Sequence, residues 1–244
     1  MGELAFQDLI VKMPKGIGGH KHVSMIIDAA SRRVSAMALK SKDEALVHCV
    51  AYVRTLEKKG QRVKTWRSDN GGEFVNEDYK NFLMKEGIAQ DLGAPYTPQS
   101  QGLVERANGV FKRLMGKTLR SLGLPMDVWP GLVPGVVRSM NSAVHAVLGQ
   151  SPLKKAGEVL SDRMPALALG DVVSVVDPHT KRTFEGFYGG QISDHVLSVV
   201  ARATDGGWRL MRVHPSAAKL IAWPGRAVPQ SSSGLQKPEG GEHR

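Results

Sequence analysis

The sequence predicts an α/β protein in which helices flank a mixed five-stranded sheet, followed by a small all-β barrel. Three observations support this fold class. Up to about residue 150, short apolar runs alternate with amphipathic helical patterns. Two early strands are joined by a short polar turn, which makes part of the sheet antiparallel. After about residue 169 the pattern changes to short strands separated by Gly- and Asp-rich turns.

The first part of the chain supplies three strands. Leu4–Val11 is a buried strand that contains one carboxylate, Asp8. A lone carboxylate inside an apolar strand is costly unless it is paired or bound to a metal. The second strand, Val23–Ile27, ends at Asp28, and Val34–Leu39 follows as the third. Asp8 and Asp28 are therefore both candidates for a functional acid.

The first helix is predicted after the third strand. Ser41 and Glu44 have the spacing of a capping box, in which Ser41 would cap the helix. Apolar residues, Cys49 among them, then recur at helical spacing until Gly60. This helix is expected to pack on the sheet, and a core position explains Cys49.

A strand, a second helix and a last strand come next. Arg62–Trp66 favours a strand, Asn76–Glu86 a helix capped by Asn76, and Ile88–Leu92 the final strand. Glu73 and Glu77 lie near the helix start, where acidic side chains ordinarily interact with the helix dipole. They are not predicted to be catalytic.

A long helix begins near Gly102. At about 100° per residue, one arc is apolar and predicts the core face: Leu103, Val104, Ala107, Val110, Phe111 and Leu114. The opposite arc holds Glu105, Gly109, Lys112, Arg113, Gly116 and Arg120. A charge run of this kind is usually a solvated helix face. The alternative is a surface that contacts a polyanionic partner.

The remaining chain divides into segments that differ in composition and in hydrophobic pattern. The helical pattern Met126–Val147 completes a first domain, residues 1–150. Residues 151–168 are predicted to be a linker and residues 169–224 a small β-barrel. Residues 225–244 are rich in Pro, Ser and Gly without an apolar period, which predicts a disordered tail.

Composition narrows the class of protein. The 244 residues include 33 basic and 23 acidic side chains, a net charge of +10, which favours a polyanionic partner. The single cysteine, Cys49, excludes a disulfide framework. There is no apolar run of about 18 residues and no secretory signal pattern at the amino terminus. We therefore expect a soluble intracellular protein that is not secreted and has no membrane partner.

Two motifs carry the functional signal. Ser68–Phe74 reads Ser-Asp-Asn-Gly-Gly-Glu-Phe, and Pro98–Gly102 reads Pro-Gln-Ser-Gln-Gly shortly before Glu105. Between Asp69 and Glu105 lie 35 residues. In spacing and flanking residues the chain resembles the D-D-35-E catalytic core of retroviral and retrotransposon integrases, over about Leu4–Leu160. The first motif is similar to copia-type elements and the second to retroviral and gypsy-type enzymes.

This resemblance implies a ribonuclease-H-like core with Asp8, Asp69 and Glu105 as catalytic metal ligands. Asp8 is preferred as the first ligand over the alternative, Asp28, because in copia-like relatives an acidic residue at the position of Asp28 is structural. Oxygen ligands select Mg²⁺ or Mn²⁺, and two ions are expected. The implied reactions are hydrolysis at a DNA end and attack of the freed 3′-hydroxyl on target DNA.

The expected partners are element ends and target DNA, together with further copies of the chain in a homo-oligomer, and the expected location is the nucleus. The predicted DNA-binding residues are Tyr96, Gln101, Asn108, Lys112 and Arg113. For the charged face of the long helix we prefer a DNA-facing surface over a solvated one, because its row begins at Glu105, a candidate metal ligand. Gly109 stands where relatives often have a basic residue. The region from Phe184 to Ser216 is loosely similar to the SH3-like or chromodomain-like modules that end some integrases, so the small β-barrel, residues 169–224, could bind DNA.

Two other functions are compatible with the motifs. One is a nuclease of the ribonuclease H group, which would carry extra acidic ligands and lack the Pro-Gln-Ser-Gln-Gly loop. The other is a catalytically inactive DNA-binding remnant of a retroelement. Integrases usually have an amino-terminal zinc module with two His and two Cys, which one cysteine cannot supply. His20-Lys21-His22 is accordingly expected to be a loop or strand entry and no metal site.

Overall fold

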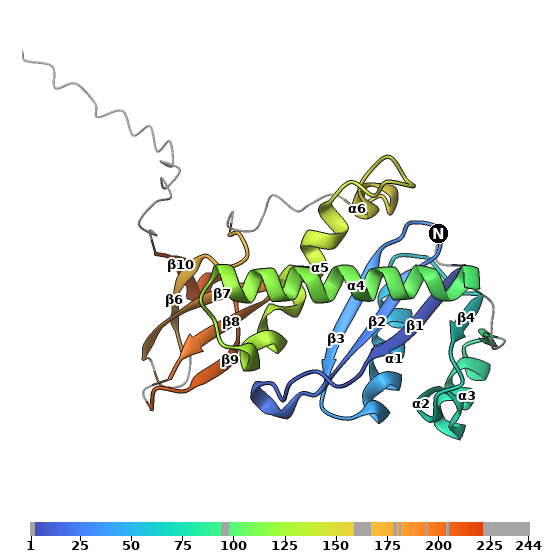
Figure 1. The fold of residues 1–244 in the computed structure, drawn as a ribbon, viewed down its shortest axis with the longest axis horizontal. Coiled ribbons are helices and arrows are strands. Elements are labelled where there is room, and N and C mark those ends of the chain that lie inside the picture. The colour runs from blue at the N-terminus through green and yellow to red at the C-terminus, as the bar shows by residue number, and fades with distance from the viewer. Residues whose placement is uncertain are drawn as a thin grey trace, which may run out of the picture.

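The computed structural model describes residues 3–93, 98–158, 167–177, 180, 182–193, 195–203 and 205–221. Its first unit is a five-stranded sheet in the order β3-β2-β1-β4-β5 (Figure 1). The strands are β1 (Leu4–Ile10), β2 (His22–Asp28), β3 (Val34–Leu39), β4 (Thr65–Ser68) and β5 (Ala89–Leu92). Since β1 pairs antiparallel with β2 and parallel with β4, the predicted mixed sheet is confirmed.

Helices cover both faces of this sheet. They are α1 (Ala45–Glu57), α2 (Gly72–Val75) and α3 (Glu77–Lys85) on one face, and α4 (Pro98–Ser121) and α5 (Trp129–Ser142) on the other. Side chains alternate along β1: Ala5 and Leu9 join the hydrophobic cluster of α1 and α3, whereas Phe6 and Ile10 join that of α4 and α5. Asp8 therefore belongs to the face that α4 covers.

Of the two predicted helix caps, one is confirmed and one is wrong. The Asn76 side chain accepts a hydrogen bond from Tyr79 N at 2.9 Å, as expected of an N-cap. Ser41 makes no capping hydrogen bond, and a 3₁₀ turn over Lys42–Glu44 precedes α1. The Glu44 carboxylate instead accepts from the Lys40 backbone N–H at 2.6 Å, so the reciprocal pair of a capping box does not form.

The core face of α4 includes the predicted Val104 and Phe111, both buried, and also Met115 and Leu119, which the prediction missed. The following helix is shorter than predicted. After a 3₁₀ turn at Met126–Val128, α5 ends at Ser142, and residues 145–150 form a turn closed by a bridge between His145 and Gln150.

The end of α5 is attached to the edge strand β3 through one side chain. Asn141 is buried; its Oδ1 accepts from Val34 N at 2.8 Å and its Nδ2 donates to Val34 O at 2.7 Å. The amide thus satisfies the two backbone groups that a neighbouring strand would otherwise pair.

The second unit is an all-antiparallel sheet in the order β10-β6-β7-β8-β9, consistent with the expected small barrel. Its strands are β6 (Val172–Val176), β7 (Thr183–Ser193), β8 (Val196–Arg202), β9 (Trp208–Val213) and β10 (Ala218–Leu220). Residues 225–244, predicted to be a disordered tail, lie outside the described residues. In the part of the chain that the structure describes, no helix is both long and apolar enough to cross a membrane.

The segment between the two units is partly packed. A short helix, α6 (Pro152–Lys155), lies within the predicted linker, and Pro152 is buried. Glu158 accepts hydrogen bonds from Arg33 Nε at 3.1 Å and Lys59 Nζ at 2.5 Å, which ties this segment to the first unit.

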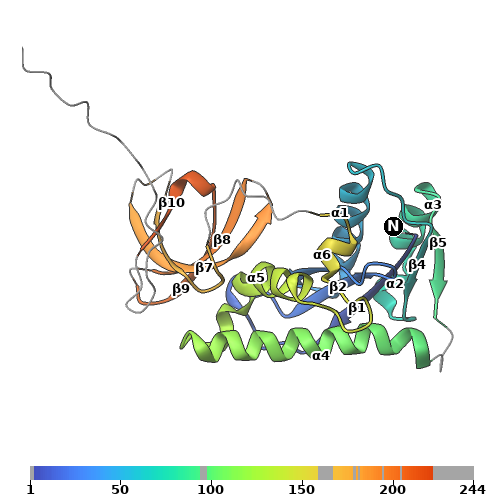
Figure 2. The same ribbon diagram turned by 90° about the horizontal axis from the view of Figure 1, so that it is seen from above.

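Helix α5 lies between the two units, and the second sheet packs directly on it (Figure 2). Val200 of β8 belongs to the same hydrophobic cluster as Leu132 of α5 and Met25 of β2. Ser198 Oγ donates to Gly131 O at 2.7 Å. A Cβ added at Gly189 of β7 would lie 2.0 Å from Gly131 O, so the strand and the helix touch backbone to backbone. The two units therefore form one packed body.

Candidate active site

Asp8 and Asp69 are neighbours across two parallel strands. β1 and β4 pair up to Phe6 opposite Arg67, and the same register continued by two residues sets Asp8 opposite Asp69. Residues opposite one another point to the same face. The Arg67 guanidinium lies 5.6 Å from the centre of the Phe6 ring, which places this pair on the α4 face and predicts the same face for the two carboxylates.

Asp8 is half-buried and held by two donors. Its Oδ1 accepts from Leu9 N at 2.8 Å, and its Oδ2 accepts from Asn108 Nδ2 at 2.6 Å. Burial raises the pKa of Asp8 above its ordinary value, the two hydrogen bonds lower it, and the negative charges of Asp69 and Glu105 raise it further. All three predicted acids are thus close enough to interact electrostatically.

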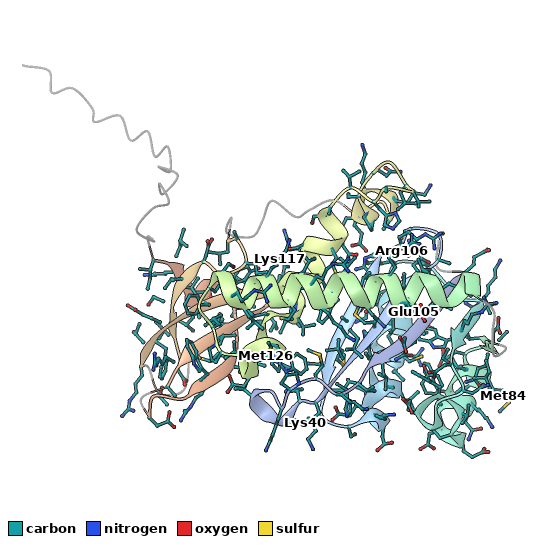
Figure 3. All side chains as sticks on the ribbon, viewed as in Figure 1. Lys40, Met84, Glu105, Arg106, Lys117 and Met126 are labelled. Carbon is teal, nitrogen blue, oxygen red and sulfur yellow. The ribbon has the colours of Figure 1, made fainter. Side chains whose placement is uncertain are left out.

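Glu105 reaches this region from α4. It lies three residues before Asn108, one turn earlier on the same side of the helix, and its side chain is exposed. Figure 3 shows Glu105 on the side of α4 that faces β1, with Arg106 on the other side. Asp69 is also exposed, and its Oδ1 accepts from Gly71 N at 3.0 Å.

The donor set fits a hard divalent cation. Carboxylates that lie close together repel one another and are stabilised by a cation between them. Asn108 Oδ1 is buried without a hydrogen-bond partner, so a second hard oxygen lies beside Asp8. Nevertheless, in the described residues no group of three His, Cys, Asp or Glu side chains already has metal-binding geometry.

Asp28, the alternative first ligand, lies elsewhere. It is opposite Ala5 in the register of β1 and β2, whereas Asp8 is opposite Met25. It is buried, and its Oδ2 accepts from Ser31 N at 2.7 Å and Ser31 Oγ at 2.6 Å. Asp28 therefore stabilises the turn between β2 and β3, and the geometry favours Asp8 as the functional acid.

The predicted DNA-binding residues differ in what the structure describes. Lys112 and Arg113 are exposed on α4. The Asn108 amide is directed to Asp8. Tyr96 lies outside the described residues, and so does the side chain of Gln101, whose backbone is in the first turn of α4.

Beneath Asp8, a buried polar network that the sequence did not predict anchors β1. Gln7 Nε2 donates to Ser24 Oγ at 2.8 Å and to Ala45 O at 3.0 Å, and Tyr79 Oη donates to Gln7 Oε1. His48 Nδ1 lies 2.8 Å from Ser24 Oγ. One sequence feature pointed to this network, namely Gln7, a polar residue beside Asp8 in an apolar strand. The hydrogen-bond partners of Gln7 are distant in the sequence, so the network could not be predicted.

Two ion pairs flank the acids. On the α4 face, Arg67 Nε donates to Asp91 Oδ2 at 2.8 Å. On the α1 side, Lys42 Nζ lies 3.3 Å from Glu73 Oε1. A Cβ at Gly71 would lie 3.0 Å from both Asp69 Oδ1 and Glu73 Oε2, so the Glu73 carboxylate is adjacent to the Asp69 turn. The sequence predicted only a role for Glu73 at the start of the helix, but in the structure its carboxylate also lies beside the turn that holds Asp69.

Comparison with known proteins supports the interpretation of these motifs. Residues 2–98 match the family described as "Integrase core domain". The chain is 31% identical over 129 residues to the retrovirus-related Pol polyprotein from transposon TNT 1-94 of Nicotiana tabacum, covering 52% of this chain and 10% of that protein. It is 29% identical over 143 residues to the Pro-Pol polyprotein of feline foamy virus, covering 58% and 12%. The chain thus spans about a tenth of the length of these relatives.

Solved structures show the same fold. A chain of the simian T-cell lymphotropic virus intasome in complex with PP2A regulatory subunit B56 gamma matches with a TM-score of 0.53 and 19% identity, covering 91% of this chain and 80% of that one. The HTLV-2 integrase catalytic core domain in complex with magnesium, in a trimeric form, matches with a TM-score of 0.50 and 22% identity, covering 63% and 95%.

Proposed function

Because residues 2–98 of this chain match the integrase core domain family, we propose that the chain is the catalytic part of a retrotransposon-type integrase. Its substrates are the ends of element DNA and a target duplex. The observation that carries this proposal is the convergence of Asp8, Asp69 and Glu105 on the α4 side of the sheet, combined with the 35 residues between the last two acids.

The proposed chemistry is two successive displacements at phosphorus. In end processing a water oxygen attacks a phosphodiester near the 3′ end, the P–O bond to the 3′ oxygen of the retained strand breaks, and that oxygen leaves as a hydroxyl. In strand transfer the freed 3′-hydroxyl attacks a target phosphodiester, loses its proton and replaces the target 3′ oxygen. No covalent bond to the protein forms in either step.

The acids and their neighbours have distinct tasks in this scheme. Asp8, Asp69 and Glu105 would hold Mg²⁺ or Mn²⁺, which lowers the pKa of an attacking oxygen and stabilises the leaving one. Asn108 keeps the Asp8 carboxylate in place through its 2.6 Å hydrogen bond. The Arg67 and Asp91 pair, 2.8 Å apart, neutralises a further carboxylate on this face, so that Asp91 does not add to the local negative charge.

The similar proteins support the partners we propose. One is named as part of an intasome and another as a magnesium complex in a trimeric form. We accordingly propose divalent metal, DNA and self-association for this chain, and action on chromosomal DNA in the nucleus. The +10 net charge agrees with a nucleic-acid partner.

Strand transfer of a labelled library of terminal repeat duplexes into plasmid DNA tests the proposal, with Mg²⁺ or Mn²⁺ present. Joining by the unmutated chain should be lost in Glu105→Gln, because the neutral amide lacks the negative charge with which the carboxylate would hold a divalent cation, while the fold remains intact by circular dichroism. The control is Glu77→Gln, an exposed acid in the first turn of α3, which should join DNA normally. Binding of DNA without nicking or joining under either metal would instead favour an inactive remnant.

A further inference from the structure

Glu73 lies close to Asp69 and is also paired with a cation. A Cβ at Gly71 would lie 3.0 Å from Asp69 Oδ1 and 3.0 Å from Glu73 Oε2, so these two oxygens are at most twice 3.0 Å apart. The other oxygen, Glu73 Oε1, lies 3.3 Å from Lys42 Nζ. One carboxylate thus connects a surface cation to the turn that holds Asp69.

The Glu73 carboxylate is the fixed partner of this ion pair. Its neighbour Phe74 is buried, and Phe74 O accepts a hydrogen bond from Gln90 Nε2 at 2.7 Å. Asn76 Nδ2 donates to Glu73 O at 3.0 Å. The Glu73 side chain is 11% exposed, whereas that of Lys42 is 49% exposed and extends from a short 3₁₀ turn. The carboxylate is therefore held in place, and the charge that balances it belongs to a side chain that is half in solvent.

The charges around the candidate active site follow a pattern. Asp91 is paired with Arg67 at 2.8 Å, and Glu73 is paired with Lys42. Within the described residues, the three acids of the site take part in no ion pair. Half-exposed ion pairs contribute little to stability, so the fold does not require the pair of Lys42 and Glu73. A carboxylate this close to Asp69 attracts a divalent cation there, and the ammonium group beside it opposes that attraction.

We propose that Lys42 and Glu73 set the affinity of the site for its divalent cation. Glu73 attracts an ion held by Asp69 through its negative charge, and Lys42 limits this attraction through its positive charge. Neither side chain contacts the reacting atoms, so both act by adjusting the electrostatic potential at Asp69. The inference rests on the proposed function, because the cation belongs to that function.

Binding of Mn²⁺ to the full chain without DNA tests this inference. The Kd is measured at fixed ionic strength from the electron paramagnetic resonance signal of the free ion. Glu73→Gln removes a negative charge and should raise the Kd, whereas Lys42→Gln removes a positive charge and should lower it, each by roughly three- to tenfold. Lys42→Arg keeps the charge and should retain the Kd of the unmutated chain. The matched control is Lys64→Gln, because Lys64 forms an exposed ion pair with Glu3 at 2.5 Å, and its Kd should be nearly unchanged.

Two checks accompany these measurements. The melting temperatures of Lys42→Gln and Glu73→Gln should stay close to that of the unmutated chain, since the pair contributes little to stability. Asp69→Asn should weaken Mn²⁺ binding, because it removes the carboxylate proposed to hold the ion. Binding of Mn²⁺ that does not depend on Asp69 would place the ion elsewhere and overturn the inference.

The signs of the two changes decide the outcome. A shift of the Kd in the same direction in Lys42→Gln and Glu73→Gln, or no shift in either, would make the pair a surface contact only and overturn the inference. If the unmutated chain joins DNA while the variants give one of these results, only the inference is wrong. If the two variants shift the Kd in opposite directions but the unmutated chain joins no DNA, only the proposed function is wrong.

Discussion

Replacing Gly189 with alanine should separate the second sheet from α5. The added Cβ would lie 2.0 Å from Gly131 O, while Cβ atoms essentially never approach other atoms closer than 3.0 Å. The strand and the helix must therefore move apart by about 1 Å, because the obstacle is backbone and cannot rotate away. The hydrogen bond from Ser198 Oγ to Gly131 O, 2.7 Å long, is lost or stretched by the same movement.

The expected cost follows from these two changes. Overpacking of a well-packed interior typically costs about 1–3 kcal/mol, and a buried hydrogen bond contributes about 1 kcal/mol. Together they give roughly 2–4 kcal/mol. In a chain of this size 1 kcal/mol corresponds to roughly 2–4 °C, so Gly189→Ala should lower the melting temperature by roughly 5–15 °C.

Differential scanning calorimetry of the full chain measures this shift. The control is Gly102→Ala in α4, where a Cβ would meet nothing within 4 Å and helix propensity should leave stability unchanged or slightly raised. A Gly189→Ala protein that melts within about 1 °C of the unmutated chain would refute the direct packing of β7 on α5.

Two further predictions concern pH and metal. Asp8 has a pKa raised above its ordinary 3.8, so its ionisation lowers the stability of the fold as pH rises from 3.8 through the folded value. In Asp8→Asn, Asn108 can turn its unpaired oxygen to the new amide. At pH 7 in EDTA this variant should have a higher melting temperature than the unmutated chain, and the difference should disappear below pH 3.8. Mg²⁺ should raise the melting temperature of the unmutated chain only. His48 is buried with a pKa of about 3, below its ordinary 6.5, so its neutral form contributes stability that is complete above pH 6.5 and is lost as pH falls toward 3. Between pH 3 and pH 6.5 the free energy of unfolding in urea should therefore change by roughly 3–5 kcal/mol less in His48→Gln than in the unmutated chain. A pH profile parallel to that of the unmutated chain would show that His48 is not buried as described.

The sequence by itself determined the features that depend on neighbouring residues. The strand β1, the Asn76 cap and the short antiparallel connection of β2 and β3 involve groups a few residues apart, and each was predicted from composition or spacing. The mixed sheet followed in the same way, whereas Asp69 and Glu105 were proposed as candidate acids because their spacing and flanking residues resemble the integrase core. Even at short range one competing partner can decide the outcome, as at Glu44, whose carboxylate binds Lys40 N and leaves Ser41 without a cap.

Only the tertiary structure decided which acids share a face and how the two units are joined. The choice between Asp8 and Asp28 depends on the register of β1 with β4 and on Asn108, which is 100 positions away from Asp8 in the chain. The contact of Gly189 with Gly131 likewise joins two segments that are far apart in the sequence and that no sequence pattern relates. Such contacts form only when separate elements pack against one another. They depend on the shape of the packed interior, which no local sequence pattern encodes.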